Sequence, residues 1–133
     1  MDAKTRLQVM ERAGSRCEYC RFKQVHLPLQ TFHLEHVIAV QHRGTADLSN
    51  LALSCTRCNA FKGTNLTSRD PDTDLVELLF NPRTQSRDEH FRVQEARIVG
   101  LAPVGRTTVW LLQMNASERV DLRALLIEDG DWD

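Results

Sequence analysis

The chain of 133 residues is long enough for one compact domain, or for a small catalytic module with an extension. Its apolar share of 41% and charged share of 26% are ordinary for a folded globular protein and exclude a disordered chain. No apolar run approaches the roughly 18 residues that a membrane helix needs, and the charged N-terminal segment lacks the apolar core of a secretory signal. We therefore expect a cytoplasmic protein whose cysteines are reduced.

The formal net charge of -1 conceals an asymmetry between the two halves of the chain. Residues 1–70 carry ten Lys and Arg against six Asp and Glu, whereas residues 71–133 carry seven against twelve. If the protein binds nucleic acid, we therefore expect the phosphate backbone to contact the first half of the chain. The charge distribution permits nucleic acid binding without requiring it.

The first half is expected to fold from two helices and two short strands. Apolar residues Ala3, Leu7 and Met10 recur on one helical face, and Gly14 is placed to end that helix. The expected elements, in chain order, are a helix over residues 3–13, a strand over 32–40, a polar turn over 41–49, a strand over 51–54 and a short helix over 59–62 that stops at Gly63.

The second half has a different character, and we predict a core of residues 1–66 followed by an extension of residues 67–133. Two strands, over residues 97–102 and 107–114, are expected to form a hairpin through Gly105, with Trp110 in the core. Ser117 is placed to cap a final helix. Its expected buried face consists of Val120, Ala124 and Ile127.

All four cysteines lie in two C-x-x-C pairs, Cys17 with Cys20 and Cys55 with Cys58. Two residues between ligands let one turn present both sulfurs, and two such turns complete the four-thiolate shell of a structural zinc ion. The alternatives are disulfides, which a reducing cytosol disfavours, and a thioredoxin-like redox motif, which does not need two copies. The pairs are further apart than the roughly 15–20 residues of a simple zinc ribbon, so further structure is expected between them.

The segment between and after these pairs resembles the HNH endonuclease motif. The matching stretches are Leu34-Glu35-His36-Val37-Ile38, residues 44–51 and residues 55–63. The resemblance covers residues 17–63 and implies a ββα-metal core, in which two strands and a helix hold one divalent ion. The expected fold class is therefore α+β. It consists of this HNH core, stabilised by a zinc ion on the four cysteines, and a C-terminal β-hairpin and helix. The loop departs from the family at Ala39, where many members have Pro, and at Arg43, where many have Gly.

Carried over by position, the resemblance implies the following roles: His36 as general base, Asn50 as the residue that holds the ring of that base, and Glu35 and Asn59 as ligands of a catalytic Mg²⁺ or Mn²⁺. His33 is a further ligand or an outer-shell partner, because it lies two residues before Glu35 on the same side of the strand. Lys62 and Arg43 are candidate contacts to the substrate phosphate.

The chemistry of phosphodiester hydrolysis explains these residue types. A neutral imidazole can take the proton of the attacking water, and a hard divalent cation can stabilise the phosphoryl group and the leaving oxygen. Carboxylate and amide oxygens suit Mg²⁺ or Mn²⁺ better than zinc. Strand alternation sends Glu35 and His36 to opposite faces, so both serve one ion only if the strand ends, bulges or twists at this place.

We therefore expect a divalent-metal-dependent endonuclease that acts on DNA. The first alternative is a non-catalytic zinc module that binds nucleic acid or protein, for which replacing His36 by alanine changes no activity. The second is a toxin or effector nuclease silenced by a partner, with the acidic C-terminal region as the interaction surface. These readings leave the oligomeric state open.

Overall fold

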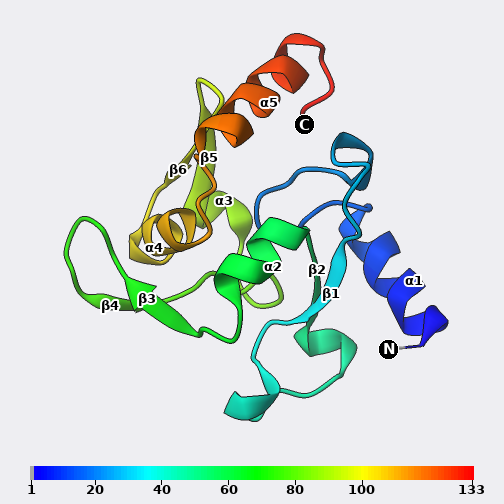
Figure 1. The fold of residues 1–133 in the computed structure, drawn as a ribbon. Helices are drawn as coiled ribbons and strands as arrows, with labels where there is room; N and C mark the ends of the chain where they lie inside the picture. Colours follow the sequence, from blue (N-terminus) through cyan, green and yellow to red (C-terminus); the bar gives the residue numbers. More distant parts are fainter. Residues whose placement is uncertain (1) are drawn as a thin grey trace. The chain divides into compact units, whose positions relative to one another are not determined.

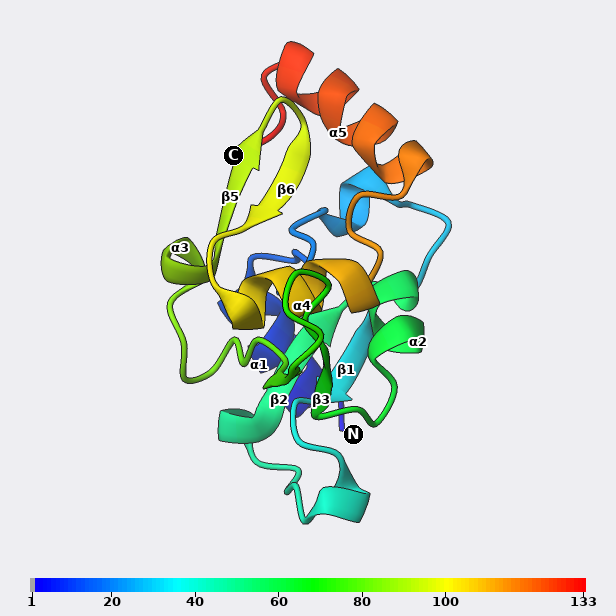
Figure 2. The same cartoon turned by 90° about the vertical axis from the view of Figure 1, so that its left-hand side faces the viewer.

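The computed structural model describes residues 2–133, and Figures 1 and 2 show it as a ribbon. The chain divides into two compact units, one of Met1–Leu66 with Asn81–Gln85 and the other of Thr67–Phe80 with Ser86–Asp133. Both contain helices and small antiparallel sheets, so the protein has the predicted α+β class. The expected division after residue 66 did not include the return of residues 81–85 to the first unit. None of the described helices is long and apolar enough to cross a membrane.

The first unit is built around one antiparallel hairpin and the helix that follows it. Its elements, in chain order, are α1 (Ala3–Ala13), the 3₁₀ turn η1 (Gln24–His26), β1 (His33–His36), the 3₁₀ turns η2 (Val40–His42) and η3 (Leu48–Asn50), β2 (Leu51–Ser54) and α2 (Thr56–Lys62). In the β1–β2 register, Glu35 lies opposite Ala52 and His36 opposite Leu51. Helix α2 lies beside β1, which completes a ββα arrangement.

Helix α1 has the predicted bounds but buries a different face. Asp2 caps its N-terminus by accepting a hydrogen bond from the backbone N–H of Thr5 at 2.7 Å, and Gly14 ends it in the left-handed conformation. Val9 is its buried residue, whereas Leu7, expected on the buried face, is 56% exposed. The guanidinium of Arg12 donates to the Leu48 carbonyl at 2.8 Å and so anchors the last turn of α1 to the β2 end of the hairpin.

The second unit holds two further hairpins and three helices. Its elements are β3 (Thr67–Arg69), β4 (Val76–Leu78), α3 (Arg87–His90), β5 (Phe91–Gln94), β6 (Arg97–Gly100), α4 (Pro103–Leu111) and α5 (Ser117–Glu128). Strand β3 pairs with β4, and β5 with β6, both antiparallel. Glu95 and Ala96, both at positive φ, form the two-residue turn between β5 and β6.

Three sequence-based expectations for this unit were wrong. Residues 107–114 do not form a strand, because Pro103 begins helix α4 at a position where its missing N–H costs nothing. Trp110 is therefore not a core residue, and it lies on α4 with 56% of its surface exposed. Ala116, and not Ser117, occupies the N-cap position of α5, and it makes no side-chain capping bond.

The buried face of α5 also differs from the expected one. Arg119 and Arg123 are its buried residues, whereas Ala124 and Ile127 are exposed. The Arg123 guanidinium donates to the Ala96 carbonyl at 2.7 Å, which fastens α5 to the turn of the β5–β6 hairpin (Figure 2). Helix α5 is thus held by a buried guanidinium that donates to backbone carbonyls, and not by a row of apolar side chains.

A buried carboxylate organises the β3–β4 side of the second unit. Asp70 follows β3 and is fully buried, and its Oδ2 lies 2.8 Å from Nη2 of Arg106 on α4. The hydrogen bonds from Arg106 hold the pKa of Asp70 below its ordinary value, although burial acts in the opposite direction. Folding therefore favours the ionised form of this side chain.

This pair makes a prediction about acid stability. A carboxyl group whose pKa is lowered by folding contributes stability above its ordinary value of 3.8, and this contribution is lost as the pH falls through the lower folded value. We expect Asp70→Asn to lower the melting temperature near neutral pH and to flatten its decline between about pH 5 and pH 3. The matched control is Asp74→Asn, which removes an ion pair between two exposed side chains and should change the acid limb little. If the melting temperatures of wild type and Asp70→Asn decline equally at acid pH, the proposed contribution of the ionised Asp70 is contradicted.

Candidate functional site

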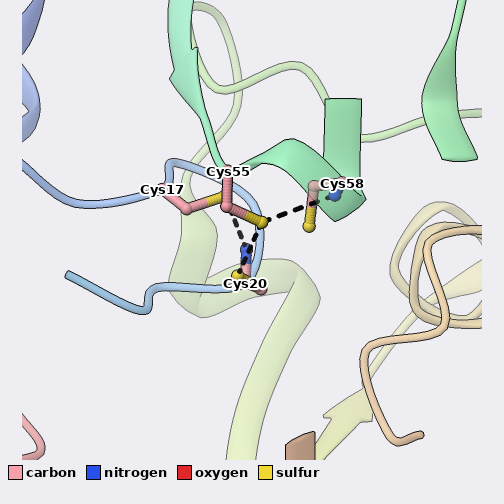
Figure 3. A group of neighbouring side chains, drawn as sticks. All are labelled: Cys17, Cys20, Cys55 and Cys58. Carbon is pink, nitrogen blue, oxygen red and sulfur yellow. Dashed lines mark hydrogen bonds between the residues drawn. The ribbon is translucent and has the colours of Figure 1, made fainter. Parts of the chain in front are cut away.

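The four cysteines converge on one point in the first unit. Cys17 and Cys20 lie in the turn after α1, Cys55 caps α2, and Cys58 lies in its first turn. Their sulfur atoms all lie within 4.8 Å of one another. Figure 3 shows the four side chains gathered at this place. The Sγ atoms of Cys20 and Cys55 are 3.7 Å apart. This separation is too long for a disulfide, and it matches the distance of about 3.8 Å between two thiolates on a tetrahedral zinc ion.

The surroundings of the sulfurs also suit a structural zinc site. The backbone N–H of Cys20 donates to Sγ of Cys17, and that of Cys58 donates to Sγ of Cys55 at 3.4 Å. Burial raises the pKa of the Cys17 thiol, which a divalent cation would offset by stabilising the thiolate. Four thiolates leave no open position for a substrate or water. The predicted structural role of the cluster agrees with this geometry.

The first cysteine turn is fastened to β2 by an acidic residue that the sequence analysis missed. The backbone N–H of Glu18 donates to the Leu53 carbonyl at 2.9 Å, and the N–H of Leu53 donates to Glu18 Oε2 at 2.8 Å. Arg83 forms an ion pair with the other carboxylate oxygen. A Glu inside a C-x-x-C turn and an Arg after an Asn-Pro turn give no local signal of this long-range pairing.

A cavity of about 500 Å³ opens at the end of β1, beside α2. Its lining includes three of the predicted site residues, Glu35, His36 and Asn59. The other lining residues are Leu34, Ala39, Val40, Gln41, Gly63 and Thr64. His36 and Asn59 are both partly exposed, so a ring nitrogen and an amide are accessible from one hollow.

Glu35 is placed differently from its two neighbours in this cavity. Its side chain is 5% exposed, and both carboxylate oxygens are buried. Oε1 forms an ion pair with Nζ of Lys62 at 2.6 Å, whereas Oε2 accepts no hydrogen bond of normal geometry from residues 2–133, although the Tyr19 hydroxyl interacts with the carboxylate. Burial raises the pKa of Glu35, although the ammonium of Lys62 acts in the opposite direction. A buried carboxylate oxygen without such a hydrogen bond, near an accessible amide, fits the donor set of a hard divalent cation.

Strand β1 ends at His36, the residue directly after Glu35, so the regular alternation of strand side chains stops there. The predicted strand over residues 32–40 was too long, since β1 ends at His36 and the chain then turns into η2. Asn50 holds this turn: its backbone carbonyl accepts from the N–H of Val37, and its side chain accepts from the N–H of Ile38 and donates to the Ile38 carbonyl, each at 2.9 Å. The hydrogen bonds of Asn50 thus go to the backbone after His36 and not to the imidazole ring.

A glycine permits this turn. A Cβ atom on Gly44 would lie 1.6 Å from the Ile38 carbonyl oxygen and 2.9 Å from Nδ2 of Asn50. Asn50 Nδ2 also donates to the Thr45 carbonyl at 2.7 Å, so the loop closes tightly around one amide. Only a residue without a side chain fits between these groups.

The remaining candidate residues lie outside the lining of the cavity. Nε2 of His33 lies 3.4 Å from Oγ1 of Thr56, at the start of α2. Arg43 is exposed at the end of η2. Lys62 was expected to contact the substrate phosphate, but its side chain is buried and its ammonium faces Glu35. In this structure it does not meet solvent as a phosphate contact would.

Comparison with known proteins agrees with this arrangement. Residues 17–65 match the family model described as HNH endonuclease. Over 124 residues the chain is 25% identical to the Septu protein PtuB of Bacillus thuringiensis, an alignment that covers 92% of this chain and 45% of that protein. The chain thus spans less than half the length of this relative, and no solved structure matches it. Residues 17–65, which hold the ββα arrangement and the four-cysteine cluster, are thus the part of the chain that is similar to the HNH endonuclease family.

Proposed function

We propose that the protein is an endonuclease that hydrolyses DNA phosphodiester bonds with the help of a divalent cation. The observation that carries the proposal is the placement of His36 and Asn59 on one cavity, within the segment that matches the HNH endonuclease family. A general base and a metal-ligating amide must reach the same phosphate, and this cavity offers both to solvent.

The residues of the chain divide the chemical work as follows. The imidazole of His36 takes the proton from the water that attacks phosphorus. Glu35 and Asn59 would hold the cation through their side-chain oxygens, and Asn50 fixes the backbone that follows the base. A bound Mg²⁺ or Mn²⁺ would neutralise charge on the phosphoryl group and stabilise the leaving oxygen. The basic surplus of residues 1–70 favours approach of a polyanion to this unit.

The test is cleavage of a supercoiled plasmid by wild-type protein and by His36→Ala. We expect wild type to nick the plasmid with Mg²⁺ or Mn²⁺, and the rate constant of His36→Ala to be about 10²–10⁴-fold lower because no group accepts the proton. The control is His42→Ala, which removes an exposed imidazole from the loop next to the cavity and should leave the rate unchanged.

The requirement of cleavage for a divalent cation is measured without removing the structural zinc ion. The protein is dialysed against metal-free buffer that contains no strong chelator, because such a chelator would also remove the structural ion. Cleavage should stop and return when Mg²⁺ is added. Nicking that persists without added metal, or that His36→Ala retains in full, would overturn the mechanism; a folded protein that binds DNA without cutting it would indicate a non-catalytic zinc module instead.

A further inference from the structure

We propose that Lys62 is a positioning residue for the reaction proposed above, which holds the two residues that flank His36 in the chain and does not touch the substrate. This role rests on the proposed nuclease function, because Lys62 can position catalytic groups only if the reaction takes place. Its structural basis lies in the contacts of one buried ammonium group.

The ammonium of Lys62 contacts both sides of the candidate base. Nζ lies 2.6 Å from Oε1 of Glu35 and donates a hydrogen bond to the Val37 carbonyl at 2.9 Å. Glu35 and Val37 are the residues immediately before and after His36, and both are 5% exposed. One buried cation therefore fixes the chain on both sides of His36, which is itself partly exposed and lines the cavity.

The position of Lys62 excludes a simple phosphate contact. The residue is 2% exposed, in the last turn of α2. To reach a phosphate, Nζ would have to leave both acceptors and abandon a carboxylate whose two oxygens are buried. An uncompensated buried charge is strongly unfavourable, so the resting contacts favour a fixed ammonium.

The same contacts orient Glu35. The ion pair engages Oε1 and leaves Oε2 without a hydrogen bond of normal geometry among the described residues. Tyr19, between Cys17 and Cys20, is fully buried next to this carboxylate. The phenol of Tyr19 has no cationic form, so it cannot balance the charge of this carboxylate. Lys62 is therefore the group that compensates the charge of Glu35, in the way that outer partners orient metal-ligating side chains.

The first experiment measures the pairing without reference to cleavage. We compare the melting temperatures of wild type, Glu35→Gln, Lys62→Met and the double variant Glu35→Gln/Lys62→Met. Each single change leaves a buried partner without its counterpart, so the double variant should melt higher than Lys62→Met alone. The control Lys4→Met removes an exposed ammonium from α1 and should not change the melting temperature. A double variant that melts no higher than either single variant would overturn the pairing.

The second experiment separates a positioning residue from a substrate contact. For Lys62→Met, assayed below its melting temperature, we expect unchanged DNA affinity and an unchanged slope of log K against log salt. The Mg²⁺ concentration for half-maximal cleavage should rise roughly 10–100-fold, because Glu35 is no longer oriented. A slope that falls by about one, with a raised KM and an unchanged Mg²⁺ requirement, would show a phosphate contact and overturn the proposal.

These readouts also keep the two proposals apart. If Lys62→Met does not fold, DNA binding and its salt slope are measured on the double variant, where a lost phosphate contact would still lower the slope by about one. If wild type binds DNA and does not cleave it, the nuclease proposal fails and the positioning role fails with it, whereas the melting cycle still decides whether Lys62 and Glu35 are paired.

Discussion

Replacing Cys55 by serine is expected to abolish zinc binding and to unfold the unit that carries the cysteines. A structural zinc site of this kind contributes about 10–16 kcal/mol of apparent binding free energy at neutral pH, which equals or exceeds the entire stability of a typical domain. Serine keeps the shape of the side chain and removes the thiolate. The sulfur of Cys55 also accepts the N–H of Cys58 and caps α2, a role that the serine hydroxyl can take over, so the substitution tests the bond to the metal.

The measurement combines metal analysis with unfolding. Wild type should contain about one zinc ion per chain, and Cys55→Ser should contain none. Circular dichroism and amide exchange should place the loss of structure in residues 2–66, where the cysteines tie α1, β2 and α2 to one point. The matched control is Ser54→Ala, a change at the neighbouring buried position, which removes one hydrogen bond to the Cys55 carbonyl. We expect it to cost about 1 kcal/mol and to keep the metal.

Zinc-free protein that keeps the melting temperature and the near-ultraviolet spectrum of wild type would contradict this prediction. Removal of zinc with a chelator should reproduce the effect of Cys55→Ser in the wild-type chain. Addition of zinc should then restore wild type and should not restore the variant, since three thiolates and a hydroxyl bind zinc far more weakly than four thiolates.

The features that the sequence predicts best are those fixed by short-range geometry. Two residues between cysteines suffice to place both sulfurs on one turn, so the cluster follows from spacing. Gly14 ends α1 where it was expected to, because the left-handed conformation at a helix end favours glycine. Gly63 likewise ends α2 where it was expected to, whereas the end of β1 at His36 was missed, because the β-favouring residues continue to Val40.

The errors arise where tertiary contacts decide. Thr107 and Thr108 are β-branched and favour a strand, yet both are fully buried in α4. The hydroxyl of Thr108 donates to the Val104 carbonyl within the helix and accepts the N–H of Phe80 from another segment, at 2.7 and 2.9 Å. The residues near Thr108 in the sequence do not include Phe80, whose contact stabilises the helical conformation here.

Lys62 shows the same limit within the candidate site. A lysine three residues after Asn59 on a short helix is ordinarily a surface charge, and the resemblance to a nuclease makes it a natural phosphate contact. Its actual partner, Glu35, lies on a different element, and only the pairing of β1 with β2 and the packing of α2 beside β1 bring the two charges together. Burial of a charge depends on such a partner, and a single position in the sequence does not reveal it.

The second large effect is expected for Gly44→Ala in the loop after β1. A Cβ atom at this position would lie 1.6 Å from the Ile38 carbonyl oxygen, which is backbone and cannot rotate away. The backbone must therefore shift, and the two hydrogen bonds between Asn50 and Ile38 break with it. We expect the free energy of unfolding to fall by more than about 3 kcal/mol, the upper end of ordinary overpacking, because no flexible side chain can absorb the clash.

Gly14→Ala is the matched control, because it separates this clash from conformational strain. Gly14 has a positive φ of 64°, and nothing lies within 4 Å of a Cβ placed there, so its substitution should cost only about 1–2 kcal/mol of backbone strain. Chemical denaturation of both variants measures the difference. In protein that remains folded, Gly44→Ala should also lower the cleavage rate, because the displaced Ile38 is two residues from His36. Equal destabilisation by the two variants would mean that the loop relaxes freely and that Asn50 does not fix the backbone behind the base.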